Sequence, residues 1–385
     1  MTSPNFHCPF DQSKIYYQVG DKKTYSKPEA LVWAGGQMDR ISFHFLDEVF
    51  DQLDWATEPS ASIHELQSQR AKEIRQQYNF VSIQYSGGYD SQTIVDIFIQ
   101  NGLLVDELVI VKKSYLDNKH WQNLESAAAV QQALFYKKHI WPKLSIKEIA
   151  LDLDYIKDFF LTHKNNWVEH TDNELWITRR TCGNLYNYQK DLVKTVDTYD
   201  SHVIIDGKEK PRLWIENGAW YSSMIDSAIS WSMNSRNLHF FYSDPELYMK
   251  QSWNMLNWLE SFPLTTVDEL HTLLHQVQCH KVSLELYRDW NFSIGRTPVH
   301  NMYAYNPMIS KFKWDGDPRT VEESQILSKL FEGSQILNYY NSGINEYMNQ
   351  YKDVVLDPHK WYVHSKKHFM KMVEPGKNYK AEIMV

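Results

Sequence analysis

A short turn with two adjacent glycines constrains the fold of this chain more than any other feature of its sequence. Residues 80–85 form the apolar-rich run of a buried strand, residues 86–89 read Ser-Gly-Gly-Tyr, and residues 90–100 have the apolar spacing of a helix. The pair is conspicuous because the 385-residue chain has only 14 glycines. Glycine adopts backbone conformations closed to other residues, so the pattern predicts a tight strand–turn–helix corner.

Strands and helices alternate on both sides of this corner. Strands are expected at 80–85, 108–111, 146–151 and 203–205, with helices at 90–100, 120–138 and 155–163 between them. Such alternation is typical of right-handed crossovers joining parallel strands. The sequence therefore predicts an α/β fold, a parallel sheet with helices on both faces.

Three regions are expected along the chain. Residues 1–75 form a mixed cap, with a hairpin at 15–22 and a helix at 62–77 capped by Ser60 or Ser62. Residues 76–245 form the α/β domain, and residues 246–385 a mainly helical, aromatic-rich region in which Pro245 opens the first helix.

Composition narrows the function classes. The chain has a net charge of −8 and only three cysteines, and no run approaches the roughly 18 apolar residues of a membrane span. These features exclude an integral membrane protein and a disulfide scaffold, and a reducing cytoplasm is expected because the N-terminus lacks a signal peptide. A broad nucleic-acid surface is normally basic, which this chain is not, but a local basic cleft leaves a nucleic-acid partner open.

The corner at 86–91 has the chemistry of a phosphate site. A parallel strand delivers it to the carboxyl edge of the sheet, where open α/β sheets bind ligands. Backbone N–H groups of the turn and of the first helical turn have no intrahelical partner, and the helix dipole favours an anion there. Two serines add hydroxyl donors, so the expected phosphate-binding residues are Ser86, Gly87, Gly88, Tyr89, Asp90 and Ser91.

The segment Ser-Gly-Gly-Tyr-Asp-Ser at 86–91 resembles the pyrophosphate-binding loop (PP-loop) of the ATP pyrophosphatase superfamily, whose domains have the HUP-like fold of adenine nucleotide alpha hydrolases. The likeness covers about residues 78–245 and is greatest to asparagine-synthetase-type domains. Residues 70–78 also resemble the preceding helix of compact synthetase-like proteins, some of them encoded by phages.

The resemblance implies an AMP-forming ligase. Such enzymes cleave ATP between its α and β phosphates, release pyrophosphate, and let a nucleophile such as ammonia displace AMP from the adenylated substrate. The glycine loop at 86–91 would hold the pyrophosphate, and Asp90 would hold Mg²⁺, which keeps several waters and takes few carboxylates.

A second loop in the family ends a later strand and faces the same phosphates. The stretch Asp-Gly-Lys-Glu-Lys-Pro-Arg at 206–212 occupies that place here. The resemblance implies that this loop neutralises the leaving group, with Lys208 as the principal catalytic cation, and the residues implied are Gly207, Lys208, Lys210 and Arg212. By the same likeness, adenine would rest on the second strand near Val111 and Lys112.

The partners implied are a small acid or carbonyl substrate and ammonia or another amine. Position 2 is Thr2 rather than the catalytic cysteine of glutamine-using synthetases, so a separate amidotransferase is one expected source of ammonia. Lys208, Glu209 and Lys210 replace acidic residues of the family, so the resemblance does not identify the substrate. Two alternatives remain open: an enzyme that adenylates or thiolates a nucleic acid or nucleobase, and a nucleotide-binding protein without turnover.

Other features are assigned mainly to packing. His271, His275 and Cys279 share one face of an expected helix and would form part of a zinc site only with further ligands. A lone Cys182 is expected to be a small buried residue. Glu216 and Asn217 follow the second loop and are weaker candidates for substrate contact.

Overall fold

The computed structural model describes most of the α/β region and parts of both flanking regions. The residues described are 14–24, 30, 33–112, 124–150, 152–166, 201–207, 211–224, 226, 237–241, 244–260, 269, 331–350, 363–374 and 383–384. The following description concerns these residues.

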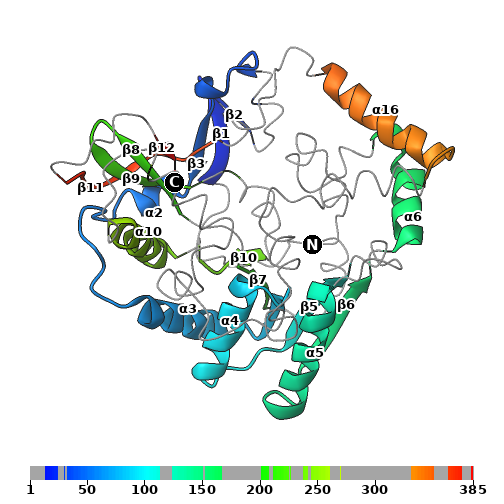
Figure 1. Cartoon of the computed structure of the whole chain (residues 1–385), viewed down its shortest axis with the longest axis horizontal. Helices are drawn as coiled ribbons and strands as arrows, with labels where there is room; N and C mark the ends of the chain where they lie inside the picture. Colours follow the sequence, from blue (N-terminus) through cyan, green and yellow to red (C-terminus); the bar gives the residue numbers. More distant parts are fainter. Residues whose placement is uncertain are drawn as a thin grey trace.

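A five-stranded parallel sheet forms the centre of the α/β region (Figure 1). Its order is β10-β7-β4-β5-β6, and every neighbouring pair is parallel. The strands are β4 (Phe80–Gln84), β5 (Glu107–Lys112), β6 (Ser145–Ala150), β7 (His202–Asp206) and β10 (Asn237–His239). Numbered along the chain, this order is 3-2-1-4-5 read from β6, the strand order of Rossmann-like folds. The expected α/β class and parallel sheet are confirmed.

Helices connect the strands of this sheet as expected. They are α4 (Tyr89–Gln100), α5 (Leu124–His139) and α6 (Leu153–His163), with α3 (Ile63–Gln77) preceding β4. In α3, Ser62 Oγ accepts a hydrogen bond from the Glu65 amide and the Glu65 carboxylate accepts one from the Ser62 amide. This reciprocal capping box fixes the first turn of α3 and confirms Ser62 as its cap.

Alternating side chains place one apolar face of the sheet against α4 and α5. Val81 and Ile83 of β4, Leu108 and Ile110 of β5, and Ile205 of β7 belong to one buried cluster with residues of both helices. The same cluster includes Leu66, Ala71 and Ile74 of α3. Burial of this apolar area, at roughly 25 cal/mol per Å², stabilises the Rossmann-like unit.

A second core joins segments that are far apart in the sequence. The N-terminal sheet has the order β2-β1-β3, and an antiparallel sheet has the order β11-β9-β8-β12. Figure 1 shows these two sheets side by side, with α10 next to them. The elements are β1 (Ile15–Val19), β2 (Lys22–Thr24), η2 (Met38–Arg40), β3 (Ser42–Phe45), α2 (Asp47–Phe50), β8 (Arg212–Glu216), β9 (Ala219–Ser223), α10 (Pro245–Glu260), β11 (His368–Met372) and β12 (Ile383–Met384).

Hydrogen bonds across this second core connect its segments. The Tyr17 hydroxyl donates to Asp226 at 2.9 Å, and the Trp253 indole donates to the Trp55 carbonyl at 3.1 Å. α10 begins at Pro245 as expected, and Asp244 caps it by accepting from the Leu247 amide at 2.9 Å. The hairpin of β1 and β2 is also confirmed, with Val19 paired with Lys22.

The two cores divide the chain in a different way from the three expected ranges. α3, expected in the cap, packs in the core of the parallel sheet, whereas β8 and β9, expected in the α/β domain, pack in the second core. The C-terminal region contains α10 and α16 (Gln335–Gln350), and it also supplies β11 and β12 to the antiparallel sheet. α16 packs on α6, where the rings of Phe160 and Tyr340 meet edge to face with their centroids 6.0 Å apart.

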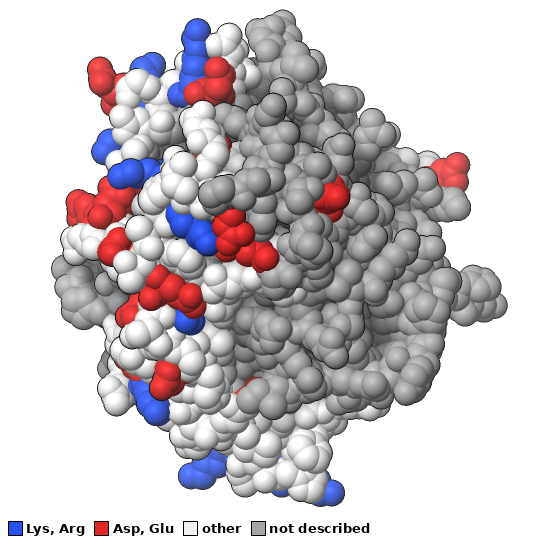
Figure 2. Space-filling view, turned by 60° about the vertical axis from the view of Figure 1, so that its left-hand side comes forward, with Lys and Arg blue, Asp and Glu red and all other residues white. Residues whose placement is uncertain are grey.

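Within the described part of the chain, no helix is both long and apolar enough to cross a membrane. Figure 2 shows acidic and basic side chains interspersed over the described part of one face. That part of the face therefore lacks the single-sign basic character of a broad nucleic-acid surface.

Candidate functional site

The glycine turn lies where the strand order of the parallel sheet reverses. From β4 the chain moves outward to β5 and β6, and it later returns to β7 on the other side of β4. The carboxyl ends of β4 and β7 therefore flank the switch point, the usual ligand crevice of open α/β sheets. Ser86 follows β4 and Gly207 follows β7, so the two loops expected from the sequence begin at this crevice.

Gly87 needs both its conformation and its small size. Its φ of +74° lies in the left-handed region, which other residues rarely adopt. A Cβ on Gly87 would lie 3.3 Å from the Cβ of Ala129 in α5. The turn is therefore pressed against α5, and a side chain at this position would disturb both the backbone and the packing.

Gly207 brings the second loop against the first. A Cβ on Gly207 would lie 3.1 Å from the Cβ of Asp90 and 3.0 Å from Cδ1 of Ile94, both in α4. Only a glycine allows β7 to end this close to the first turn of α4. The structure thus brings together Gly207 and Asp90, as the sequence predicts for two loops that face one ligand.

The two serines of the turn have different environments. Ser86 is exposed, and its Oγ accepts a hydrogen bond from the Gly88 amide at 3.2 Å. Ser91 is only 6% exposed; its Oγ accepts from the Ser86 amide and donates to the Gly88 carbonyl, both at 3.2 Å. Ser91 therefore shapes the turn from within, and Ser86, although exposed, also bonds inside the turn, with its Oγ 3.3 Å from the Oγ of Ser91.

The N-terminus of α4 completes the anion-favouring part of the site. Gly88 is its N-cap with φ −80° and ψ 170°, and no side chain of the described residues caps it. The amides of the first turn have no intrahelical acceptor, and the helix dipole adds positive potential at this end. Tyr89 is the first residue of α4, and Asp90 lies partly buried in its first turn.

The remaining predicted residues fall into three groups. Val111 and Lys112 lie at the carboxyl end of β5, next to β4, where Lys112 forms an ion pair with Glu148 at 2.7 Å. Arg212 begins β8 and pairs with Ser223 in the antiparallel sheet, so it is part of a strand rather than of a loop. Lys208, Lys210, Cys182, His271, His275 and Cys279 lie outside the described residues.

Glu216 and Asn217 have structural roles. Asn217, at φ +50°, and Gly218, at φ +74°, form the two-residue turn between β8 and β9. Positive φ at both central residues is typical of a tight two-residue hairpin, and Asn-Gly is the sequence that favours it. Glu216 forms an ion pair with Lys367 at 2.6 Å, which ties β8 to the segment preceding β11.

Sequence reasoning missed two polar groups beside the loops. Asp206 and His239 are both buried at the ends of β7 and β10, with Nδ1 of His239 2.6 Å from Oδ1 of Asp206. They are 33 positions apart in the chain. The three-residue β10 is too short to be predicted from a local sequence pattern. Gln92 and Asp96 of α4 form the second group, and their spacing of four on a mostly apolar helix is the signal that would have revealed them.

The arrangement fits a bound phosphate chain. Two glycines remove side chains where backbone meets neighbouring helices, and the N-terminus of α4 lies at the crevice beside the exposed Ser86. Among the described residues, no three histidine, cysteine, aspartate or glutamate side chains gather to hold a metal by themselves. A magnesium ion at Asp90 would therefore take further ligands from phosphate and water.

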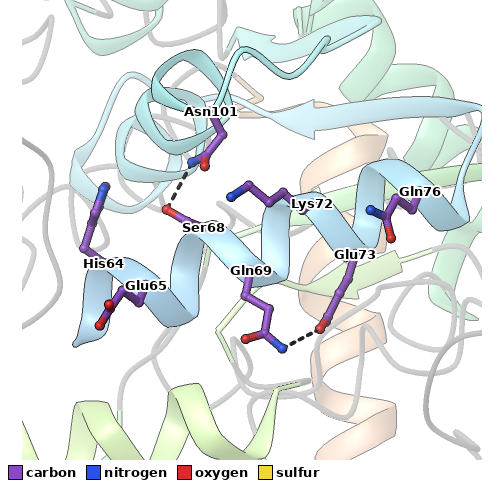
Figure 3. Close-up of a pocket in the computed structure, with 8 residues that line it drawn as sticks. All are labelled: His64, Glu65, Ser68, Gln69, Lys72, Glu73, Gln76 and Asn101. Atoms are coloured by element: carbon purple, nitrogen blue, oxygen red, sulfur yellow. Dashed lines mark hydrogen bonds between the residues drawn. The ribbon is translucent and has the colours of Figure 1, made fainter. Parts of the chain in front are cut away.

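A separate polar groove lies along α3 (Figure 3). It has a volume of about 560 Å³ and is lined by α3 and by Asn101 at the C-terminal end of α4. Its side chains bind one another: Asn101 donates to Ser68 at 3.1 Å and Gln69 donates to Glu73 at 2.9 Å. Because α4 is about 18 Å long, this groove is remote from the glycine turn at the other end of the helix.

Comparison with known proteins leaves the site to be interpreted from its own geometry. No protein-family model matches the chain, and no curated protein shows a significant match to it.

Proposed function

We propose that this chain is an ATP-dependent, AMP-forming synthetase with the fold of the ATP pyrophosphatase superfamily. It would adenylate a small acid or carbonyl substrate, release pyrophosphate, and let ammonia or another amine displace AMP. One observation carries the proposal: the Ser-Gly-Gly turn at 86–88 lies at the switch point of a Rossmann-like sheet, with Gly207 of the fourth strand packed against Asp90.

The glycine loop would act mainly by positioning and by electrostatic stabilisation. An oxygen of the substrate forms a bond to the α phosphorus while the bond to the α–β bridging oxygen breaks, and the bonding electrons leave with pyrophosphate. Backbone amides at Gly87 and Gly88, the Ser86 hydroxyl and the dipole of α4 would stabilise the growing charge on that leaving group, with the Gly88 amide exchanging its bond to Ser86 Oγ for one to phosphate. Magnesium held at Asp90 would supply further charge neutralisation.

The nucleotide would lie across the carboxyl edge of the sheet. With the β and γ phosphates at the glycine loop, adenine would contact the end of the neighbouring strand at Val111 and Lys112; the pairing of β4 with β5 supports this assignment. Lys208 follows Gly207 directly, so we assign it to the leaving pyrophosphate and expect Lys210 to assist it.

Product analysis tests this proposal. The protein is incubated with α-labelled ATP, Mg²⁺, ammonia and a panel of small carboxylic acids, and the labelled products are separated. Labelled AMP together with pyrophosphate supports the proposal, whereas labelled ADP with phosphate contradicts it. ATP binding without any turnover across the panel would favour a nucleotide-binding protein instead.

A further inference from the structure

A network of buried polar side chains lies next to the glycine turn. Its centre is Gln92 of α4, only 5% exposed, whose Oε1 accepts from the Tyr85 hydroxyl at 2.5 Å. Nε2 of Gln92 donates to Oδ1 of Asp96 at 2.5 Å and to the Tyr136 hydroxyl at 2.7 Å. Both donor positions and the acceptor of this amide are thus used within four side chains.

The network is attached to the turn from three sides. Tyr85 immediately precedes Ser86, and its amide donates to the Val109 carbonyl of β5 at 2.8 Å. The backbone N–H of Gln92 donates to the carbonyl of Gly88, the N-cap of α4, at 2.9 Å. Tyr136 projects from α5, the helix whose Ala129 touches Gly87. A rearrangement of these side chains would therefore shift Tyr85, before the turn, and Gln92, after it, and so alter the conformation of the turn.

Asp96 determines which way the Gln92 amide points. An ionised carboxylate can only accept hydrogen bonds, so it holds Nε2 toward itself and leaves Oε1 facing Tyr85. A protonated carboxyl can also donate, so the amide gains a second orientation with Oε1 toward Asp96. In that orientation Tyr85 faces the Nε2 donor of Gln92 and loses this acceptor, so its hydroxyl has to turn toward the Tyr136 hydroxyl, its other hydrogen-bond partner.

The ionisation of Asp96 falls within an accessible pH range. Burial raises the pKa of the Asp96 carboxyl to about 6, and the hydrogen bond from Gln92 opposes the rise only in part. The groups that face it are Gln92 on its own helix, Tyr85 after β4 and Tyr136 of α5. Burial raises the pKa of both tyrosine hydroxyls above the usual value, so both stay neutral where Asp96 titrates.

We propose that Tyr85, Gln92, Asp96 and Tyr136 form a positioning network that holds the glycine turn in its nucleotide-binding shape while Asp96 is ionised. Protonation of Asp96 frees the Gln92 amide, loosens Tyr85 and lowers affinity for the phosphate chain. These are positioning residues, since they act through the turn and not on the ligand. The inference rests on the proposed nucleotide site.

The first test uses the ligand-free chain. Side-chain amide resonances of Gln92 and backbone amide resonances of Gly87 and Gly88 are followed by NMR from pH 5 to pH 8. We expect all three to titrate with a common midpoint near the Asp96 pKa of about 6, and this transition to disappear in Asp96→Asn. Loop glycines that stay unchanged while Gln92 titrates would overturn the coupling, whatever the chain binds.

The second test measures ATP dissociation constants in the presence of Mg²⁺ at pH 5 and pH 7. ATP also titrates near pH 6, so the comparison is between variants rather than between pH values alone. The wild-type chain should lose about tenfold more affinity than Asp96→Asn on going to pH 5, because only about a tenth of Asp96 is then ionised. Asp158→Asn, which changes an exposed carboxylate on α6, serves as the control and should follow the wild type.

The outcomes separate the two claims. Parallel profiles for wild type and Asp96→Asn overturn the positioning role and leave the proposed nucleotide site standing. Absence of ATP binding at both pH values overturns the nucleotide site and the affinity effect together, while the NMR titration still reports on the network. Thermal unfolding of each variant at both pH values verifies that folded protein is compared.

Discussion

Gly207 and Asp90 approach so closely that a Cβ on Gly207 would lie 3.1 Å from the Cβ of Asp90. One residue ends the fourth strand of the parallel sheet along the chain, and the other lies in the first turn of the helix after the first strand. Their contact closes the switch point of the sheet from two sides. It is therefore the structural basis for assigning both loops to one ligand.

Substituting Gly207 tests this contact. In Gly207→Ala the added methyl meets Ile94 and the backbone of Asp90 at 3.0–3.1 Å, so the start of α4 has to shift. We expect a loss of about 1–3 kcal/mol in unfolding free energy. ATP affinity should fall as well, which calorimetric titration would measure. An unchanged affinity would show that the ligand does not depend on this closure.

Gly87→Ala tests the conformation of the turn itself. Alanine at φ +74° costs about 1–2 kcal/mol, and its methyl also presses on Ala129. Gly102→Ala is the matched control, because Gly102 has φ +64° and nothing lies within 4 Å of its added Cβ. Gly102→Ala should lose stability through its φ alone and Gly87→Ala somewhat more, but only Gly87→Ala should weaken ATP binding, by about tenfold or more. Equal effects of the two substitutions on ATP affinity would show that the turn does not bind the nucleotide.

The two serines are expected to differ in effect. Ser86→Ala removes the hydroxyl of an exposed residue and should weaken ATP binding by about tenfold, with a smaller loss of stability than Ser91→Ala because water can replace its bond to the Gly88 amide. Ser91→Ala removes two internal hydrogen bonds of a buried hydroxyl and should lower stability by about 1 kcal/mol or more. Binding and melting measurements on both variants test this division. A Ser86→Ala variant with wild-type affinity would contradict it.

Asp96 makes a prediction about stability and pH. Its pKa of about 6 in the folded chain exceeds the usual 3.8, so the folded state binds more protons between these values. Stability contributed by this group is therefore present below about pH 4 and lost as the pH rises through 6. Asp96→Asn should remove this loss. At pH 7 its unfolding free energy should exceed that of the wild type by up to about 3 kcal/mol.

This advantage of Asp96→Asn should shrink to a small part of its pH 7 value near pH 4, where the folded carboxyl is protonated and the unfolded one about half protonated. Denaturant unfolding at pH 4 and pH 7 gives the two differences. A variant that is destabilised equally at both pH values would show that Asp96 has an ordinary pKa.

The sequence predicted the parts of the fold that have strong local signals. The strands β4, β5, β6 and β7 are short apolar runs, and the helices between them carry regular apolar spacing, so both were recognised. The hairpin of β8 and β9 has an Asn-Gly turn at 217–218, but its position after the expected phosphate loop led to a different interpretation. The three-residue β10 is too short to give a periodic pattern.

The site was predictable only where its residues are adjacent in sequence. The turn at 86–91 is a contiguous motif, and the placement of Gly207 opposite it was expected only from the resemblance to the ATP pyrophosphatase superfamily. The pair of Asp206 and His239, the contact of Gln92 with Tyr136 and the membership of Arg212 in β8 depend on tertiary contacts that no local pattern encodes.

The most direct measurement of the central claim is a crystal structure with an ATP analogue that carries a methylene group between its α and β phosphates. We expect its β and γ phosphates within hydrogen-bond distance of the Gly87 and Gly88 amides and of the Ser86 hydroxyl. Its adenine should lie toward the end of β5. A bound analogue located elsewhere, with the glycine turn making no contact to phosphate, would contradict the account.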